Sequence, residues 1–375
     1  MGRSVNRSVI RWTLVTVLLC TLLPPFVMAA HSLIAGERLA RGAQADAAKQ
    51  NWQAAFQGYQ AALALNPWRP GLRRVLAKTS RRWAQEYDGT AEPAVERALI
   101  EALVGTADDG SLFLVLDRSM AAVPAGAFWL GEMQGRDDEQ PARRVTLRAY
   151  QIDRYEVTLA QYGMFVAATG TNPPRYWIDG EYPMGTAAQP VVGVSWQQAQ
   201  AFCRWAGKRL PTEAEWEKAC RGEDGLTYPW GEVWDPERAN VGLQSGDAWP
   251  TRLDDVWTWL EAGGAPDSPQ LLPVGSLPGG VSPYGVMDLV GNASEWVQDA
   301  YNWSGYAQSP SHDPLVSEPS WNHVVRGSAW IDLAGQQAQV AFLSRCAARS
   351  SSHSADDPRV GFRCARDSPG EPAAE

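Results

Sequence analysis

The placement of its five cysteines constrains the fold of this 375-residue chain more than any other feature. Cys20 lies in an apolar N-terminal stretch, whereas the other four form two clusters, Cys203 with Cys220 and Cys346 with Cys364. Four cysteines in the body of the chain allow two disulfides and leave no spare thiol. The sequence alone leaves three pairings of these four open. Two disulfides also require an oxidising compartment, and the N-terminal segment bears on whether the chain reaches one.

Residues 1–32 are predicted to be a signal-anchor or a signal peptide. Three arginines precede an apolar stretch from Trp12 to Ala30, an order that keeps the N-terminus cytoplasmic while the remainder crosses the membrane. Ala29 is the small residue that a signal peptidase prefers, and cleavage would make the protein secreted. The apolar stretch is nearly long enough to span a bilayer, which favours a retained anchor. We therefore predict a membrane-anchored protein whose bulk lies on the periplasmic or extracellular side.

The charge and the histidines argue against two classes of function. The net charge is −9 and no cluster of Lys or Arg lies outside the N-terminus, so no basic stripe is available to bind nucleic acid. The histidines are scattered and none has the spacing of a metal-ligand pair, which argues against a histidine-ligated iron site. They are His31, His312, His323 and His353.

Residues 33–110 are predicted to form a helical neck rich in Ala, Leu, Gln and Arg. Within it, a set of small and aromatic residues follows the second half of a tetratricopeptide repeat: Ala55, Tyr59, Ala62 and Pro67. Small alanines let two helices approach closely, and the proline ends the second helix. One repeat cannot bury its own apolar face, so we favour a helical spacer between membrane and head. The alternative is a peptide-binding array.

Beyond about residue 105 the composition changes, with more Gly, Pro and Trp and no long helical patterns. Three short helices are still predicted, because each is preceded by a hydroxyl residue with Gln or Glu three residues later. The pairs are Thr158 with Gln161, Ser195 with Gln198, and Thr212 with Glu215. Alternating apolar and polar residues predict strands over 144–150 and 323–326.

Six segments, in the correct order, resemble the formylglycine-generating enzyme, or sulfatase-modifying factor, family. They are Val123–Gly131, Ala149–Thr158, Pro190–Glu217, Tyr228–Gly231, Tyr284–Trp296, and Arg345–Ser350 with Val360–Cys364. The most specific is AFCRWAGKRLPTEAEWE, from Ala201 to Glu217. Because six motifs occur in order, a chance match is excluded, and the resemblance covers a domain over residues 118–368.

The resemblance implies an α+β head with a duplicated C-type-lectin-like fold and little regular secondary structure. This fold agrees with a composition rich in Trp, Gly and Pro. The same resemblance implies the disulfides Cys203–Cys364 and Cys220–Cys346. Residues 369–375 would follow the domain as a disordered tail.

Members of the family also bind structural calcium. The corresponding ligand set here is Asp288, Gly291, Ala293 and Glu295, which offers two carboxylates with main-chain carbonyls between them. Hard oxygen donors in a compact turn suit Ca²⁺ rather than Zn²⁺. The alternative is a solvated acidic turn. The apolar residues around these positions would leave unpaired carboxylates poorly hydrated, so we expect a cation.

A long insertion from Gln244 to Leu272 is individual to this chain. It disturbs the match at a second, weaker calcium site, which would use Asn240, the Val241 carbonyl and Asp267. Its aromatic residues, Trp249, Trp257 and Trp259, are either a local cover for the core or a docking surface for a partner. Within it, residues 253–260 fit a short amphipathic helix.

The resemblance fails where the family performs its chemistry. Active oxidases carry a pair of catalytic cysteines, and these positions hold Asp332 and Ala341 in this chain, while Ala329 replaces a serine of the motif. Copper(I) held by two thiolates is soft-ligand chemistry that neither Asp nor Ala supplies. Formylglycine formation is therefore not expected, and neither copper nor iron is expected as a cofactor.

These observations predict a non-catalytic, membrane-anchored binding or scaffold protein of the cell envelope. Its partners would be the membrane, through the N-terminal segment, and an envelope complex or an exported polypeptide. The alternative is an enzyme of altered chemistry that uses the remodelled groove, with Asp332 or Arg349 as acid, base or anion contact.

Overall fold

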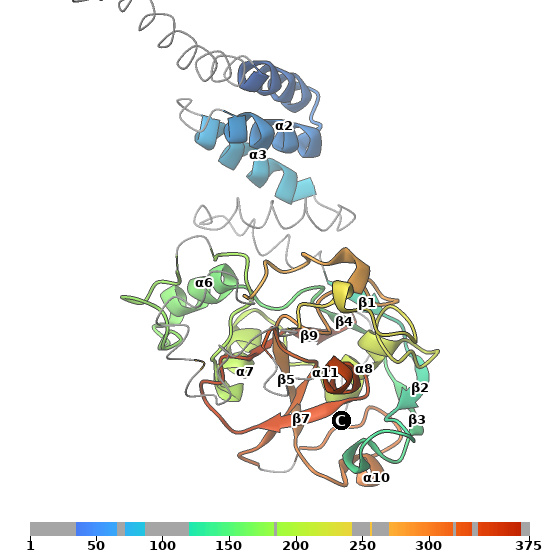
Figure 1. Cartoon of the computed structure of the whole chain (residues 1–375). Helices are drawn as coiled ribbons and strands as arrows, with labels where there is room; N and C mark the ends of the chain where they lie inside the picture. The colour runs from blue at the N-terminus through green and yellow to red at the C-terminus, as the bar shows by residue number, and fades with distance from the viewer. Residues whose placement is uncertain are drawn as a thin grey trace, which may run out of the picture. The chain divides into compact units, whose positions relative to one another are not determined.

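A computed structural model of the chain describes residues 35–65, 72–86, 120–183, 186–241, 256, 270–317, 320–331 and 337–368 (Figure 1). These residues belong to two compact units, one helical and one mixed. The expected export segment, residues 1–32, and the expected tail, residues 369–375, lie outside them. Across these ranges, no helix is both long enough and apolar enough to cross a membrane.

The helical unit contains a helix over 35–48, α2 (Trp52–Leu65) and α3 (Leu72–Glu86). Small residues make the first two helices pack closely: a Cβ atom added at Gly58 would lie 2.8 Å from the Cβ of Ala43. The apolar core of this unit consists of Ala40, Ala43, Ala55, Tyr59, Ala62 and Leu72. Three of the four residues in the expected repeat pattern are therefore buried, and Pro67 lies outside the described ranges. The assignment to a tetratricopeptide repeat stays a prediction.

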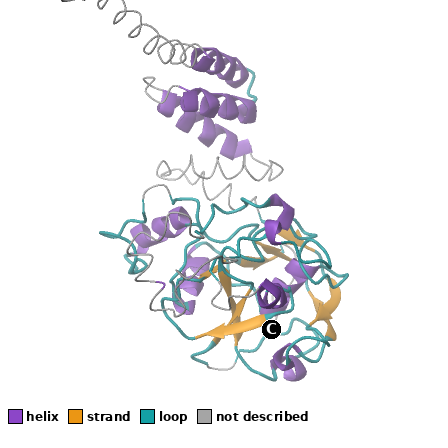
Figure 2. Cartoon of the chain, in the orientation of Figure 1, coloured by secondary structure: helices purple, strands orange, loops and turns teal. Residues whose placement is uncertain are grey.

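The mixed unit contains three small sheets with short helices around them (Figure 2). One sheet has the order β1 (Ala121–Val123), β4 (Tyr150–Ile152), β9 (Ala365–Asp367), and β2 (Gly126–Leu130) pairs with β3 (Arg143–Leu147). The third has the order β7 (Arg349–Ser352), β6 (His323–Arg326), β5 (Ser294–Ala300), β8 (Val360–Phe362). The β5–β8 pair is parallel and the other pairs are antiparallel. The strands are short, as the sequence predicts for this α+β fold.

The helices of this unit are α6 (Leu159–Thr169), α7 (Trp196–Trp205), α8 (Glu213–Arg221), α10 (Gly305–Gln308) and α11 (Gln337–Leu343), with 3₁₀ turns at Asp137–Glu139, Pro236–Arg238 and Pro278–Gly280. The first three begin at the predicted caps, and each forms a complete capping box. At α8, for example, the Thr212 hydroxyl accepts from the Glu215 amide at 3.2 Å, and the Glu215 carboxylate accepts from the Thr212 amide at 2.8 Å. The local sequence therefore determines where these helices start.

The predicted strand over 323–326 is confirmed as β6, but the single strand predicted over 144–150 is wrong. That segment divides between β3 and β4, which belong to different sheets. The break lies at Arg148, whose amide donates to Asp313 Oδ1 at 2.9 Å. Asp313 is distant in sequence, so an alternating pattern contains no sign of the break.

Two disulfides, Cys203–Cys364 and Cys220–Cys346, join segments 161 and 126 residues apart. This is the pairing that the family resemblance implies. Each bridge lies inside a separate apolar core: Cys220 and Cys346 pack with residues such as Phe128, and Cys203 and Cys364 pack with residues such as Phe362. Each bridge therefore ties together, within one apolar core, segments that are far apart in the sequence.

Candidate functional site

A cavity of about 210 Å³ lies between the β7–β6–β5–β8 sheet and the segment that follows β6. Its walls come from segments far apart in the chain: Ser294 of β5, Val325 of β6, Gly327 to Ala329, and Ser350 to Ser352 of β7. Leu343, at the end of α11, closes another side. This is the region where the resemblance places the family's catalytic groove.

Serine hydroxyls are the main polar groups of the cavity. The Ser344 hydroxyl donates to the hydroxyl of Ser328 at 2.9 Å, and the Ser351 hydroxyl accepts from Asn322 Nδ2 at 3.2 Å. Ser350 is exposed on β7.

No histidine is among the described residues that line the cavity. His323 is the cross-strand partner of Ser352, but its ring stacks on Trp196 at 3.9 Å and no hydrogen bond joins it to a cavity hydroxyl among the described residues.

The three arginines that line the cavity are each bound to a carboxylate. Arg136 Nη2 contacts Asp138 Oδ2 at 2.7 Å, and Arg359 Nη2 contacts Asp357 Oδ2 at 2.8 Å. Arg349, the third, binds the buried Glu213 at 2.8 Å. The cavity is therefore close to neutral, and none of these guanidinium groups is available as an unpaired anion contact.

Behind the cavity, buried charges form a network that joins α8 to β6 and β7. Arg326 contacts Glu213 at 3.0 Å and Glu217 at 2.7 Å, and Arg349 holds both carboxylate oxygens of Glu213 at 2.8 Å. The Tyr306 hydroxyl donates to Glu217 Oε2 at 2.9 Å. All five side chains are buried. Arg349 therefore has a structural role in this network, and its expected role as acid, base or anion contact stays a prediction.

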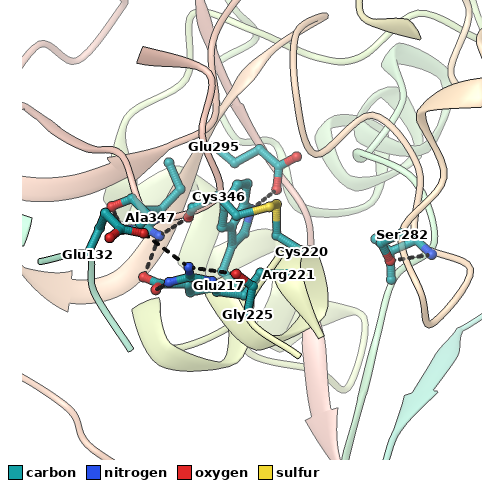
Figure 3. The surroundings of a disulfide bond; sticks show 12 residues. Glu132, Glu217, Cys220, Arg221, Gly225, Ser282, Glu295, Cys346 and Ala347 are labelled. Carbon is teal, nitrogen blue, oxygen red and sulfur yellow. Dashed lines mark hydrogen bonds and ion pairs between the residues drawn. A yellow bond between two sulfur atoms is a disulfide. The ribbon is translucent and has the colours of Figure 1, made fainter. Parts of the chain in front are cut away.

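The Cys220–Cys346 disulfide lies beside this network (Figure 3). Glu217 and Arg221 project from the same helix as Cys220, and their charged groups are 3.0 Å apart. Burial opposes ionisation of Glu217, but Arg326 and Arg221 outweigh it and hold the pKa of this carboxyl below its usual range. The glutamate therefore stays charged inside the protein.

The positions of the two catalytic cysteines are only partly described. Ala341 lies in α11, and the Tyr228 hydroxyl donates to its carbonyl at 3.0 Å, whereas Asp332 lies outside the described ranges. Ala329 is buried and lines the cavity. Every cysteine in the described part of the chain belongs to a disulfide, so this part offers no free thiol.

The expected calcium residues lie around a buried acidic turn. Both oxygens of Glu295 are engaged, by Arg363 at 2.7 Å and by the Trp216 indole at 2.8 Å. Asp288 Oδ2 accepts from the Gly275 amide at 2.6 Å. Arg363 thus occupies part of the coordination expected for a cation.

A carboxylate that the sequence reasoning missed, Glu156, lies next to Asp288. Its Oε1 accepts from Asn292 Nδ2 at 3.1 Å, while its buried Oε2 has no hydrogen-bond partner among the described residues. Burial and the neighbouring Asp288 raise the pKa of Glu156 well above its usual range. Glu156 belongs to the matched segment Ala149–Thr158, so its motif was identified in the sequence. That segment lies far in sequence from the acidic turn, and therefore the sequence did not connect the two.

These oxygen donors fit a hard cation in composition, since an orphaned buried carboxylate oxygen is a ready ligand. No three His, Cys, Asp or Glu side chains converge on one point within the described ranges. Main-chain carbonyls, such as those of Gly291 and Ala293, would have to complete a site. The weaker expected site adjoins the same turn, because the Asn292 amide donates to the Asn240 carbonyl at 2.8 Å. Val241 is buried there, and Asp267 lies outside the described residues.

The insertion is described only at Val256 and over residues 270–272. Val256 is helical and fully buried, and it packs with Ala329, Trp330 and Ile331 at the wall of the cavity. Part of the insertion therefore covers the core, which is one of the two roles that the sequence suggests for this segment. Its tryptophans, Trp249, Trp257 and Trp259, lie outside the described ranges, so their expected docking role stays a prediction.

Comparison with known proteins agrees with this geometry. Residues 116–368 match the sulfatase-modifying factor enzyme 1-like domain. A formylglycine-generating enzyme of Streptomyces coelicolor is 32% identical over 67% of this chain and 90% of its own length. A mouse protein named inactive C-alpha-formylglycine-generating enzyme 2 is 31% identical over 66% of this chain and 86% of its own length.

The chain is also similar to a protein named as a kinase and to a solved structure. A protein of Chlamydia caviae named serine/threonine-protein kinase pkn1 is 31% identical over 66% of this chain, but the chain spans only 38% of its length. The solved structure of Treponema denticola variable protein 1 superposes with a TM-score of 0.50 at 21% identity, covering 66% of this chain and 95% of that one, which is a similarity of fold alone.

The buried network predicts a large stability loss when one charge is removed. We expect Arg326→Met to lower the free energy of unfolding by about 3–5 kcal/mol, because Glu213 and Glu217 would stay buried with fewer partners. The matched control is Arg238→Met, which breaks an exposed pair with Asp235 and should leave the unfolding midpoint close to that of the wild type. Urea denaturation followed by circular dichroism measures both, and equal losses would contradict a dominant role for the network.

Proposed function

The chain belongs to the sulfatase-modifying factor family, because residues 116–368 match its domain, and we propose that this member binds a polypeptide instead of oxidising one. The observation that carries the proposal is the chemistry of the cavity. It has serine hydroxyls and carboxylate-paired arginines, and Ala341 stands where the resemblance places the second catalytic thiol. Family membership alone does not decide the matter, since relatives with both active and inactive names share the domain.

The cavity suits recognition better than catalysis. Hydroxyl groups donate and accept hydrogen bonds without a charge preference, which fits a main chain whose amides and carbonyls alternate. The one carboxylate among the described lining residues, Asp357, is already bound to Arg359, and a general base needs a free lone pair within reach of its proton. The rival function, an enzyme of altered chemistry, would depend on Asp332, which lies outside the described residues.

We also propose that the protein is held in the cell envelope by its N-terminal segment and acts as an accessory subunit of a larger complex. Two disulfides buried in separate cores are compatible with an extracytoplasmic domain, because such bonds persist in oxidising compartments. The arginines before the apolar stretch from Trp12 to Ala30 give the orientation. The exported polypeptide and the cavity would then be on the same side of the membrane.

The absence of a thiol pair predicts a null result in an oxidation assay. The full-length protein, incubated with a cysteine-containing sulfatase-type peptide, oxygen and copper, should give no aldehyde by mass spectrometry. The Streptomyces coelicolor relative, assayed in parallel, is the positive control for the conditions. Any aldehyde above the protein-free background would refute the non-catalytic assignment.

The binding role predicts that filling the cavity removes partner contact. A photo-crosslinking amino acid at Ser350 should capture a polypeptide in native envelopes, and Ser350→Trp should abolish co-purification of that same polypeptide. Ser311→Trp is the matched control, because Ser311 is exposed but does not line the cavity. A polypeptide that co-purifies equally with Ser350→Trp does not bind in the cavity, and that result would overturn the proposal.

We further propose that the acidic turn around Asp288 and Glu156 binds calcium as a structural ion. Calcium at about a hundred times its Kd would add about 2.7 kcal/mol to stability, which raises the melting temperature by a few degrees. Asp288→Asn should remove this gain, whereas Asp235→Asn, at an exposed position, should keep it. Differential scanning calorimetry with calcium and with EDTA measures the effect. Equal melting temperatures in the two solutions would contradict the site.

A further inference from the structure

A second cavity, of about 710 Å³, lies within the helical unit. Its apolar wall consists of Ala47, Trp52, Tyr59 and Val75, which come from the first helix, α2 and α3. Val75 remains 40% exposed although it faces this space. A partly covered apolar wall has room for a side chain of another molecule.

Two cations follow Val75 along the same face of α3. Lys78 and Arg82 are one turn apart, both are exposed, and neither has a hydrogen-bond or ion-pair partner within the described ranges. The one carboxylate among the described lining residues, Glu86, accepts from Trp52 Nε1 at 2.8 Å. This bond ties the indole to the end of α3 and engages that carboxylate. The cavity therefore has positive charge beside its apolar side chains.

The hydroxyls of α3 that lie next to Lys78 do not compete for a ligand. Thr79 Oγ1 and Ser80 Oγ each donate to a carbonyl four residues earlier, at 2.9 Å. Both residues are buried. Lys78 and Arg82 are thus the charged donors of the described lining, and a negatively charged acceptor would form the strongest hydrogen bonds with them.

We propose that this cavity binds an acidic peptide segment of a protein partner, one in which a large apolar residue is flanked by Asp or Glu. The apolar side chain would enter between Trp52 and Val75, and the acidic groups would reach Lys78 and Arg82. An anionic membrane surface offers the same charge but has no side chain to fill a recess, so the cavity favours a peptide. This site does not rest on the function proposed for the mixed unit.

Selection of a phage-displayed random peptide library on the full-length protein tests the proposal. We expect enrichment of sequences with Asp or Glu next to Leu, Ile, Phe or Trp. For a synthetic peptide from that selection, Lys78→Glu with Arg82→Glu should weaken binding by about tenfold or more at low salt. Arg41→Glu, an exposed charge reversal outside the cavity, should leave the affinity unchanged.

Folding of the variants is checked by thermal melting, and Lys78→Gln with Arg82→Gln provides a second pair without new negative charges. Enrichment of basic or uncharged peptides, or no enrichment at all, overturns the proposal. Equal binding by the wild type and both double variants overturns it as well. Binding to phosphatidylglycerol vesicles that depends on Lys78 and Arg82, without peptide enrichment, would replace it with a membrane contact.

Discussion

The buried contact between Arg326 and the two glutamates of α8 is the interaction on which the rest of the head depends. It holds the helix against β6, and through Glu213 it also fixes Arg349 of β7. Removing buried ions from water costs several kcal/mol each, so every member is stable only while its partners are present. Burial and the nearby Glu213 raise the pKa of Asp299 to about 7, a sign of how little further negative charge the interior accepts. The buried ion pairs therefore hold in place the strands β6 and β7, which form walls of the cavity.

This dependence explains how the fold can keep its shape while the residues of its cavity change. The network and the two disulfides use side chains that are buried in the cores, whereas Ser350, Ser351 and Ser352 line the cavity and are not fully buried. The lining can therefore change without disturbing the ion pairs and bridges of the interior. A scaffold of this kind keeps its shape while the surface of its cavity changes, which is the condition for a new ligand on an old fold.

The sequence correctly predicted those features that depend on local rules or on the order of the motifs. The capping boxes start α6, α7 and α8, and the motif order fixed the family and the cysteine pairing. Long-range partners were not predictable: Asp313 divides a predicted strand, and Arg363 occupies Glu295. Such contacts join residues 68 or more positions apart, and no local pattern marks them. For the same reason, the acidic turn could be identified from the sequence but Glu156 could not. The positions of the two catalytic cysteines could be identified, but the carboxylate-paired arginines of the cavity could not.

The two proposed binding cavities offer different interactions to a ligand, and this bears on what each would select. In the head cavity, neutral hydroxyls and paired arginines give hydrogen bonds that a main chain of almost any sequence can satisfy. In the helical unit, Lys78 and Arg82, which have no ion-pair partner among the described residues, lie beside apolar side chains and would select by charge, with a strength that falls as salt rises. Tolerant binding suits a client that varies, and charge-selective binding suits a fixed partner. A protein with both would bring many clients to one complex.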